Sequence, residues 1–223
     1  MCGITGIFCR NGRDVQKNIL KKMCDTISHR GPDGEGFWVH NNVGLGHRRL
    51  AIRELSDLGA QPMPSEDKSV IVSYNGEIYN DAILRSELEK NFGCRFKSHC
   101  DTEILPAGYQ AWGLGLFEKL EGIFSIAIWD VHKEELILAR DPMGVKPLYY
   151  YCDDQVVRFG SEIKALLADN EQKRVLSELD VADFMVNGYP SPDRSTYQDI
   201  YQVPAGSALV VSSKKQAISK YWE

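Results

Sequence analysis

Apolar residues recur along the chain with two spacings. Runs rich in β-branched and aromatic residues are typical of strands. Elsewhere the apolar residues fall three or four positions apart, as at Val15, Ile19 and Met23, which is typical of a helix with one buried face. The pattern predicts strands over 4–9, 36–40, 43–52, 69–74, 123–130, 135–140, 148–152, 156–161, 207–212 and 218–222, and helices over 15–28, 81–91, 102–112, 162–168 and 178–187.

The order of these predicted elements indicates the fold class. The helices fall into groups between runs of strands whose short connections favour hairpins. This order favours antiparallel sheets layered with helices over a doubly wound parallel sheet. Few linker-like stretches and no internal repeat interrupt the 223 residues. We therefore expect an α+β domain over residues 1–223.

Composition narrows the class of protein. With 43% hydrophobic residues and a net charge of −5, the chain has the composition of a folded globular protein. The acidic balance disfavours nucleic-acid binding, which needs a basic face. No apolar run approaches the ~20 residues of a membrane helix, and no secretory signal is present at the N-terminus. We expect no nucleic-acid or membrane partner and a cytoplasmic location.

Six cysteines occur, at positions 2, 9, 24, 94, 100 and 152. In a cytoplasmic protein these are expected to be free thiols. Cys94, His99, Cys100 and Asp101 have the chemistry of metal ligands, but no second pair at ligand spacing accompanies them. We favour a strand end leading into a loop at this place and expect no metal site.

Cys2 is a candidate nucleophile. A thiol attacks efficiently once a base has removed its proton. Removal of Met1 would give Cys2 a free α-amino group, with an ordinary pKa near ~8, beside its own thiol. Such an amine can act as the general base, as it does for N-terminal threonine nucleophiles. When position 2 is considered alone, a small buried residue is the simpler interpretation.

Asn75-Gly76-Glu77 follows a predicted strand. A side-chain amide and a backbone N–H held together can stabilise the oxyanion of a tetrahedral intermediate. Asn-Gly is also a preferred pair in two-residue type I′ hairpin turns, and taken alone the turn is the simpler interpretation.

Two charged residues match the two ends of an α-amino acid. Arg49 lies near the end of a predicted strand, and a guanidinium can bind a carboxylate through two parallel hydrogen bonds. Asp101 is placed to cap the helix predicted over 102–112, and its carboxylate could also bind an ammonium group. A solvated strand-end charge and a plain helix cap are the alternatives.

Together these segments resemble the class II glutamine amidotransferases, a family with an N-terminal cysteine nucleophile. The resemblance is strongest to the glutaminase domain of glutamine-hydrolysing asparagine synthetases. The matching segments run in family order over the whole chain. They are Met1-Cys2-Gly3-Ile4-Thr5-Gly6-Ile7, His29-Arg30-Gly31-Pro32-Asp33, Arg49-Leu50-Ala51-Ile52, Asn75-Gly76-Glu77-Ile78-Tyr79-Asn80, Asp101-Thr102-Glu103, Arg140-Asp141-Pro142-Met143-Gly144-Val145-Lys146-Pro147-Leu148-Tyr149-Tyr150, Ser161-Glu162-Ile163-Lys164-Ala165-Leu166 and Val203-Pro204-Ala205-Gly206.

The resemblance implies a four-layer αββα fold of the N-terminal-nucleophile hydrolases, with two antiparallel sheets between helical layers. It implies that L-glutamine is hydrolysed to glutamate and ammonia through a γ-glutamyl thioester. Cys2 would be the nucleophile, with its own amine as the base. The resemblance assigns the oxyanion hole to Asn75 and Gly76, the glutamine carboxylate to Arg49, backbone contacts to Leu50 and Ile52, and the glutamine α-amino group to Glu77 and Asp101.

Two positions depart from the family pattern. After the Arg-Leu pair, relatives often have Ser-Ile, then Val or Ile, then Asp, where this chain has Ala51-Ile52-Arg53-Glu54. Arg53 is therefore expected to put a charge beside the carboxylate site. Pro106 lies inside the helix predicted after Asp101. Neither departure touches the nucleophile or the oxyanion hole.

The family's synthetases also carry an ATP-dependent domain with a Ser-Gly-Gly-x-Asp-Ser phosphate loop, which this sequence lacks. We expect that C-terminal domain to be absent from this chain. The glutaminase step is then expected to need no cofactor, whereas ATP and Mg²⁺ belong to the missing domain. The expected partners are L-glutamine and a synthetase domain or subunit that accepts ammonia, with a homodimer as a further expectation.

The ammonia is expected to serve asparagine synthesis from aspartate, or amidation of another carboxylate. Two alternatives stand beside this interpretation. The chain could be a catalytically silent regulatory or interaction domain of the same fold. It could also be an N-terminal-nucleophile amidohydrolase that acts on a different amide.

Overall fold

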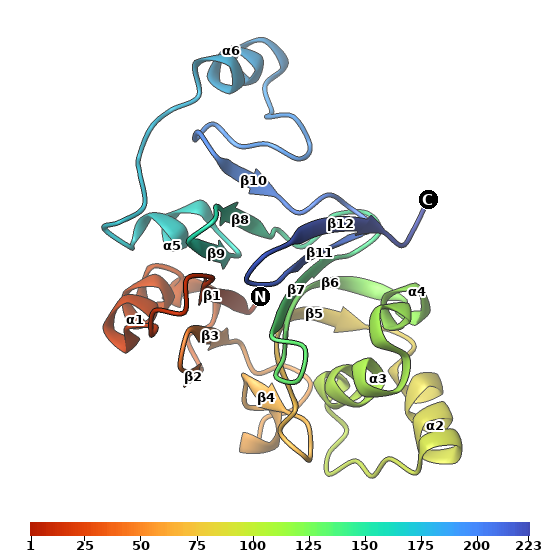
Figure 1. Ribbon diagram of the computed structural model, residues 1–223. Coiled ribbons are helices and arrows are strands. Elements are labelled where there is room, and N and C mark those ends of the chain that lie inside the picture. Colours follow the sequence, from red (N-terminus) through yellow and green to blue (C-terminus); the bar gives the residue numbers. More distant parts are fainter.

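The computed structural model describes residues 1–223 and contains two six-stranded antiparallel sheets that lie face to face (Figure 1). In the first sheet the strand order is β10 (Ile200–Gln202), β8 (Tyr149–Cys152), β9 (Val156–Gly160), β1 (Gly3–Cys9), β3 (Val43–Arg49) and β2 (Gly34–His40). In the second it is β12 (Gln216–Lys220), β11 (Ser207–Val211), β7 (Glu135–Arg140), β6 (Gly122–Asp130), β5 (Val70–Ile78) and β4 (Met63–Pro64).

Helices cover the outer face of each sheet (Figure 1). The resulting four-layer αββα arrangement confirms the α+β fold expected from the sequence. The first sheet is covered by α1 (Lys17–Thr26) and α5 (Ile163–Leu167), and the second by α2 (Asp81–Phe92), α3 (Ile104–Trp112) and α4 (Leu116–Lys119), while α6 (Glu178–Asn187) stands away from these layers.

Alternation of side chains along β1 explains how one strand serves two hydrophobic layers. Ile4 and Phe8 pack into the core between the two sheets. Ile7 and Cys9 belong instead to the smaller core beneath α1. Cys2 precedes Ile4 by two residues, so the same alternation directs it toward the space between the sheets. The sheet core therefore positions the N-terminal segment of the chain.

Most predicted elements are present, and the differences lie where tertiary pairing decides. The strand predicted over 43–52 ends at Arg49, because the following residues leave the ladder to form a loop. The strand predicted to end before Asn75 continues to Ile78, because β6 pairs with every residue of β5. The short strands β4 and β10 are not predicted from the sequence pattern.

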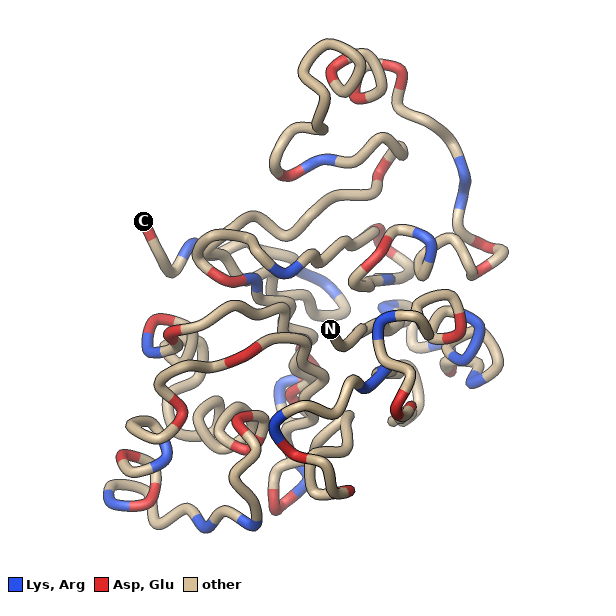
Figure 2. The backbone as a smooth tube through the Cα atoms, turned by 180° about the vertical axis from the view of Figure 1, so that it is seen from behind, with Lys and Arg blue, Asp and Glu red and all other residues tan.

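Charged residues of both signs are interspersed along the whole backbone (Figure 2). No helix in the structure combines the length and the apolar character that a membrane span requires. These observations agree with the mixed composition of the chain.

The two sheets are joined near the N-terminal segment by a buried polar contact. The side chain of His47 on β3 points between the sheets, and its Nε2 lies 3.2 Å from the carbonyl oxygen of Tyr74 on β5. Burial lowers the pKa of His47, and the hydrogen bond to Tyr74 only partly opposes this effect, so the pKa is about 4. The ring is therefore neutral at pH 7, and Nε2–H donates the hydrogen bond.

This depressed pKa makes the fold sensitive to mild acid. An unfolded histidine titrates near ~6.5, so the unfolded chain takes up the proton first and stability falls as the pH drops from about 6.5 toward 4. Between pH 7 and pH 5 we expect wild type to lose about 2 kcal/mol more free energy of unfolding than His47→Gln. Urea unfolding of both proteins at the two pH values measures this, and equal pH dependence would contradict it.

Candidate active site

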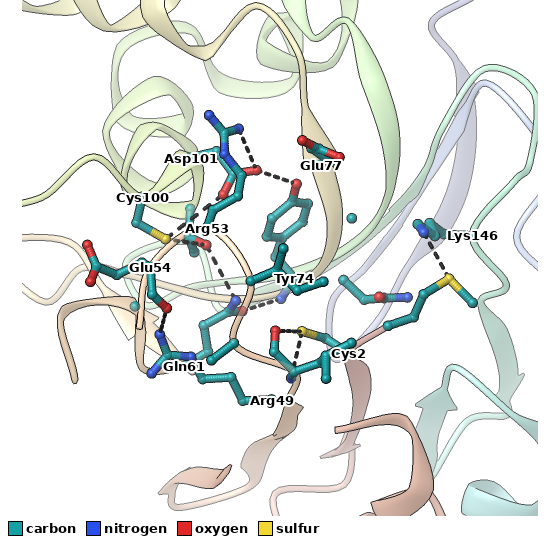
Figure 3. Close-up of a pocket in the computed structure, with 18 of the residues that line it drawn as sticks. Cys2, Arg49, Arg53, Glu54, Gln61, Tyr74, Glu77, Cys100, Asp101 and Lys146 are labelled. Atoms are coloured by element: carbon teal, nitrogen blue, oxygen red, sulfur yellow. Dashed lines mark hydrogen bonds and ion pairs between the residues drawn. The ribbon is translucent and has the colours of Figure 1, made fainter. Parts of the chain in front are cut away.

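One cavity of about 160 Å³ brings together all the residues that the sequence identifies as candidates (Figure 3). It lies where the N-terminal segment, the end of β3 and the second half of β5 meet. The candidates that line it are Cys2, Arg49, Leu50, Ile52, Asn75, Gly76, Glu77 and Asp101. These residues come from four separate segments of the chain, so the tertiary fold assembles the site.

Cys2 lies just before β1, with its thiol in the cavity. The backbone N–H of Leu50 donates a hydrogen bond to Sγ at 3.3 Å. Arg30 fixes the backbone here, because its Nε donates to the carbonyl oxygen of Cys2 at 3.0 Å. Met1 is 57% exposed. The residue before Cys2 is therefore not part of the packed core, and its removal would leave the anchoring contacts of Cys2 in place.

Asn75 and Gly76 lie inside β5, so the hairpin-turn interpretation of this pair is wrong. Asn75 is buried, and its Nδ2 lies 3.5 Å from Oγ of Ser125. The amide group carries two N–H donors, so one remains for an oxygen in the cavity. At Gly76 any Cβ would lie only 2.2 Å from the carbonyl oxygen of Ile123. Close approach of the two strands therefore requires glycine.

Arg49 ends β3 and begins the covering loop, residues 50–61, which forms one wall of the cavity. Its Nη2 donates to the carbonyl oxygen of Glu54 within this loop. The guanidinium has five N–H donors, so others remain for a carboxylate. Ile52 lines the cavity on the same loop and is 72% exposed.

Asp101 is buried in the short 3₁₀ turn before α3, and its side chain does not cap that helix as the sequence predicts. Its Oδ2 instead accepts hydrogen bonds from Tyr74 Oη at 2.8 Å and from the backbone N–H of Ile78 at 3.1 Å. Burial and the neighbouring carboxylate raise the pKa of Tyr74 well above its usual range, so the phenol remains a donor. Oδ1 has only the thiol of Cys100, at 3.9 Å.

Arg53 lies beside Asp101. The sequence instead predicts its charge beside Arg49, the residue assigned to the carboxylate of the substrate. Its Nη1 is 3.7 Å from Oδ2 of Asp101. Its Nη2 is 3.3 Å from Asp81, and Nη1 also donates to the carbonyl oxygen of Ile78 at 3.2 Å. Glu77 lies on the exposed rim near these groups.

Several cavity residues are missed by sequence reasoning. Gln61 is buried, and its Oε1 accepts from the backbone N–H of Tyr74 at 2.6 Å while Nε2 lies 3.4 Å from Thr102 Oγ1. A glutamine in a loop next to proline gives no local signal of such a contact. The burial of Tyr74 follows from its position in a strand, but its bond to Asp101 does not.

Two motifs hold the walls of the cavity through backbone contacts. Oδ2 of Asp33 accepts from the N–H of Ala51 at 2.9 Å and so anchors the covering loop. Asp141 is fully buried and accepts from the N–H groups of Val145 and Lys146, both at 2.9 Å. These bonds order the turn that carries Lys146 to the cavity.

The segment around Cys94 forms a loop between α2 and α3, and not the strand end that the sequence predicts. All six cysteines are free thiols in the structure. No group of three or more His, Cys, Asp or Glu side chains is placed to hold a metal ion.

The cavity therefore combines a thiol, amide donors, a guanidinium and a buried carboxylate. An α-amino acid could place its carboxylate at Arg49 and its ammonium at Asp101. A side chain of suitable length would then reach Cys2 and Asn75. This arrangement suits attack on a carbonyl carbon, with the oxyanion held by the amide donors.

Comparison with known proteins identifies relatives over the whole chain. The family described as the glutamine amidotransferase domain matches residues 1–222. Asparagine synthetase [glutamine-hydrolyzing] 3 of Bacillus subtilis is 36% identical over all of this chain, which covers 36% of that protein. Amidase chry2 of Gibberella zeae is 31% identical over all of this chain, which covers 34% of it. The chain thus spans about a third of the length of these two relatives.

A solved structure shows the same fold. Glutamine phosphoribosylpyrophosphate amidotransferase from B. subtilis superposes with a TM-score of 0.71 at 21% sequence identity. The match covers 99% of this chain and 49% of that one. At this identity the comparison supports the layered architecture alone.

Proposed function

We propose that this chain, which belongs to the class II glutamine amidotransferase domain family, is the glutaminase part of an ammonia-transferring enzyme. In this role it hydrolyses L-glutamine at Cys2 and supplies ammonia to an ATP-dependent amidation. The two relatives are about three times as long as this chain, which agrees with a further acceptor part.

The observation that carries this proposal is the convergence of the candidate residues on one cavity. Cys2, Asn75 and Asp101 are far apart in sequence, yet they line the same space with Arg49. Each would perform a different task for the same ligand. A silent domain has no need to keep nucleophile, oxyanion donors and both amino-acid contacts together, so the enzymatic role is favoured.

The first step forms the acyl-enzyme. The free α-amine of Cys2 accepts the proton of its own thiol, and Sγ attacks the side-chain carbonyl carbon of glutamine. Asn75 Nδ2–H and the N–H of Gly76 stabilise the oxyanion. The protonated amine then donates its proton to the leaving nitrogen. Ammonia departs, and a γ-glutamyl thioester remains on Sγ.

The second step regenerates the enzyme. The α-amine, neutral again, accepts a proton from water as the water attacks the thioester carbonyl. The tetrahedral intermediate uses the same oxyanion donors, and its collapse releases glutamate and restores the Cys2 thiol. Both steps are completed by groups of this chain, without a cofactor in the glutaminase half-reaction.

The proposed acceptor for ammonia is a carboxylate, with aspartate as one candidate. Asparagine synthesis from aspartate agrees with the name of the B. subtilis relative. The name of the Gibberella zeae protein does not specify that acceptor, so amidation of another carboxylate belongs to the same proposal. ATP and Mg²⁺ would serve this second half-reaction in a separate domain or subunit.

The test is glutamate release from L-glutamine by protein whose intact mass shows that it begins at Cys2. We expect equimolar glutamate and ammonia from the processed protein, and none from a fraction that retains Met1, because acylation of the α-amine removes the base. Full activity with Met1 attached would contradict the mechanism. Processed protein that binds glutamine without hydrolysing it, even with an acceptor domain present, would favour the silent-domain alternative.

A further inference from the structure

Arg53 is a charged residue of the cavity that the proposed function does not use. It lies on the covering loop and reaches over the rim to the buried carboxylate of Asp101 (Figure 3). Its second anchor is Asp81, at the start of α2. Arg53 thus adds a permanent positive charge to the subsite where the ammonium group of an amino acid would bind.

The contacts of Asp101 divide between its two oxygens. Oδ2 is shared by Tyr74 Oη, the N–H of Ile78 and the guanidinium of Arg53. Oδ1 has only the thiol of Cys100, at 3.9 Å, so it retains acceptor capacity for a cation. The negative charge of this buried side chain is therefore compensated from two directions. One is Arg53, which is always present, and the other is the substrate ammonium, present only with an amino acid.

We infer that the pocket also accepts five-carbon dicarboxylic monoamides that lack an α-amino group. Arg53 makes this possible as a positioning residue that acts through Asp101. The inference rests on the proposed function. Glutarate monoamide, which is glutamine without its α-amino group, is the simplest member of this class. It keeps the carboxylate for Arg49 and the amide for Cys2 and leaves the ammonium subsite empty.

The physical reason is the cost of leaving a buried charge unpaired. When a site holds its substrate through a buried polar side chain, an analogue that lacks the matching polar group is disfavoured by about 10⁴-fold in kcat/KM. The reason is that the buried side chain of the site is then left unpaired. Here Arg53 still pairs with Asp101 when the ammonium is missing. The Arg53 side chain is 37% exposed, and screening by solvent weakens the compensation. We therefore expect wild type to prefer glutamine by only about 10- to 100-fold in kcat/KM.

Arg53→Met tests this inference, because it removes the charge and keeps a long apolar side chain. The preference for glutamine over glutarate monoamide should widen by about tenfold. Arg53→Lys keeps the charge and should stay near wild type. Asp81→Asn loosens the second anchor but leaves the charge beside Asp101, so it should change kcat/KM for both substrates by the same factor. Arg13→Met, an exposed arginine paired with Glu171 outside this cavity, is the matched control.

The same comparison is made by calorimetry in a Cys2→Ala background, where no turnover is needed. The ratio of dissociation constants for the two ligands should widen about tenfold with Arg53→Met. A ratio left unchanged by Arg53→Met would overturn the inference and show that Arg53 only holds the loop. An equal widening of the ratio with Asp81→Asn would also overturn it. Failure of glutarate monoamide to bind also overturns it. Binding of both ligands with the expected ratio, but hydrolysis of neither by processed wild type even with an acceptor domain present, would refute the proposed function alone.

Discussion

Replacing Cys2 with alanine is expected to reduce glutamine hydrolysis to background while glutamine still binds. In the proposed mechanism the reaction proceeds through Sγ of Cys2, and alanine has no group that can attack the amide. The contacts proposed for the amino-acid end of the ligand, Arg49 and Asp101, are unaffected by the change. Loss of a nucleophile typically costs about 10⁶-fold in kcat. Glutamate release measures activity, and calorimetry measures glutamine affinity.

The matched control is Cys94→Ala, which changes a half-buried thiol outside the cavity. It should retain wild-type hydrolysis, apart from a modest loss of thermal stability. Two outcomes would contradict the role of Cys2. Turnover by Cys2→Ala within tenfold of wild type would show that another group attacks the amide. Loss of glutamine binding in a folded variant would show that the residue shapes the site without reacting.

Replacing Asn75 with alanine is expected to lower kcat by about 10²- to 10³-fold with a much smaller change in KM. Its amide is expected to bind the carbonyl oxygen most strongly when that oxygen becomes an oxyanion, so the loss falls on the transition state. The residue is buried, and the one hydrogen bond that its side chain makes within the protein is long, 3.5 Å from Nδ2 to Oγ of Ser125. We therefore expect only a moderate loss of stability.

Asn80→Ala provides the control for this variant. Asn80 precedes α2, and its side chain bonds to the carbonyl oxygen of Lys119 and to the N–H of Glu121, outside the cavity. It should lower the thermal midpoint while kcat stays near wild type. If Asn75→Ala lowered kcat no more than Asn80→Ala, the oxyanion role would be excluded. A thermal melt of each protein separates loss of fold from loss of rate.

Much of the fold could be predicted from the sequence because its signals are local. The strand and helix periods correctly located β1, β6, β7, β9, α2 and α6. Such features depend on neighbouring residues a few positions apart, and the printed order contains that information. The order of the family motifs then identified the fold that the topology confirms.

The errors occurred where distant partners compete with local preference. Asn75-Gly76 is a turn pair by its local chemistry, but the ladder between β5 and β6 continues through it and keeps it extended. Asp101 has the position of a helix cap, but the hydroxyl of Tyr74 and the N–H of Ile78 bind its carboxylate instead. In both cases partners more than twenty residues away provide the contacts.

The sequence by itself therefore determined the element pattern, the N-terminal thiol and the set of candidate residues. Only the tertiary structure decided that all of these candidates line one cavity, that Arg53 faces Asp101 and that Gln61 and Tyr74 support the same wall. The physical reason is that periodicity fixes which face of an element a side chain occupies. The distance between two such faces is set by strand pairing and sheet packing, which involve residues far apart along the chain.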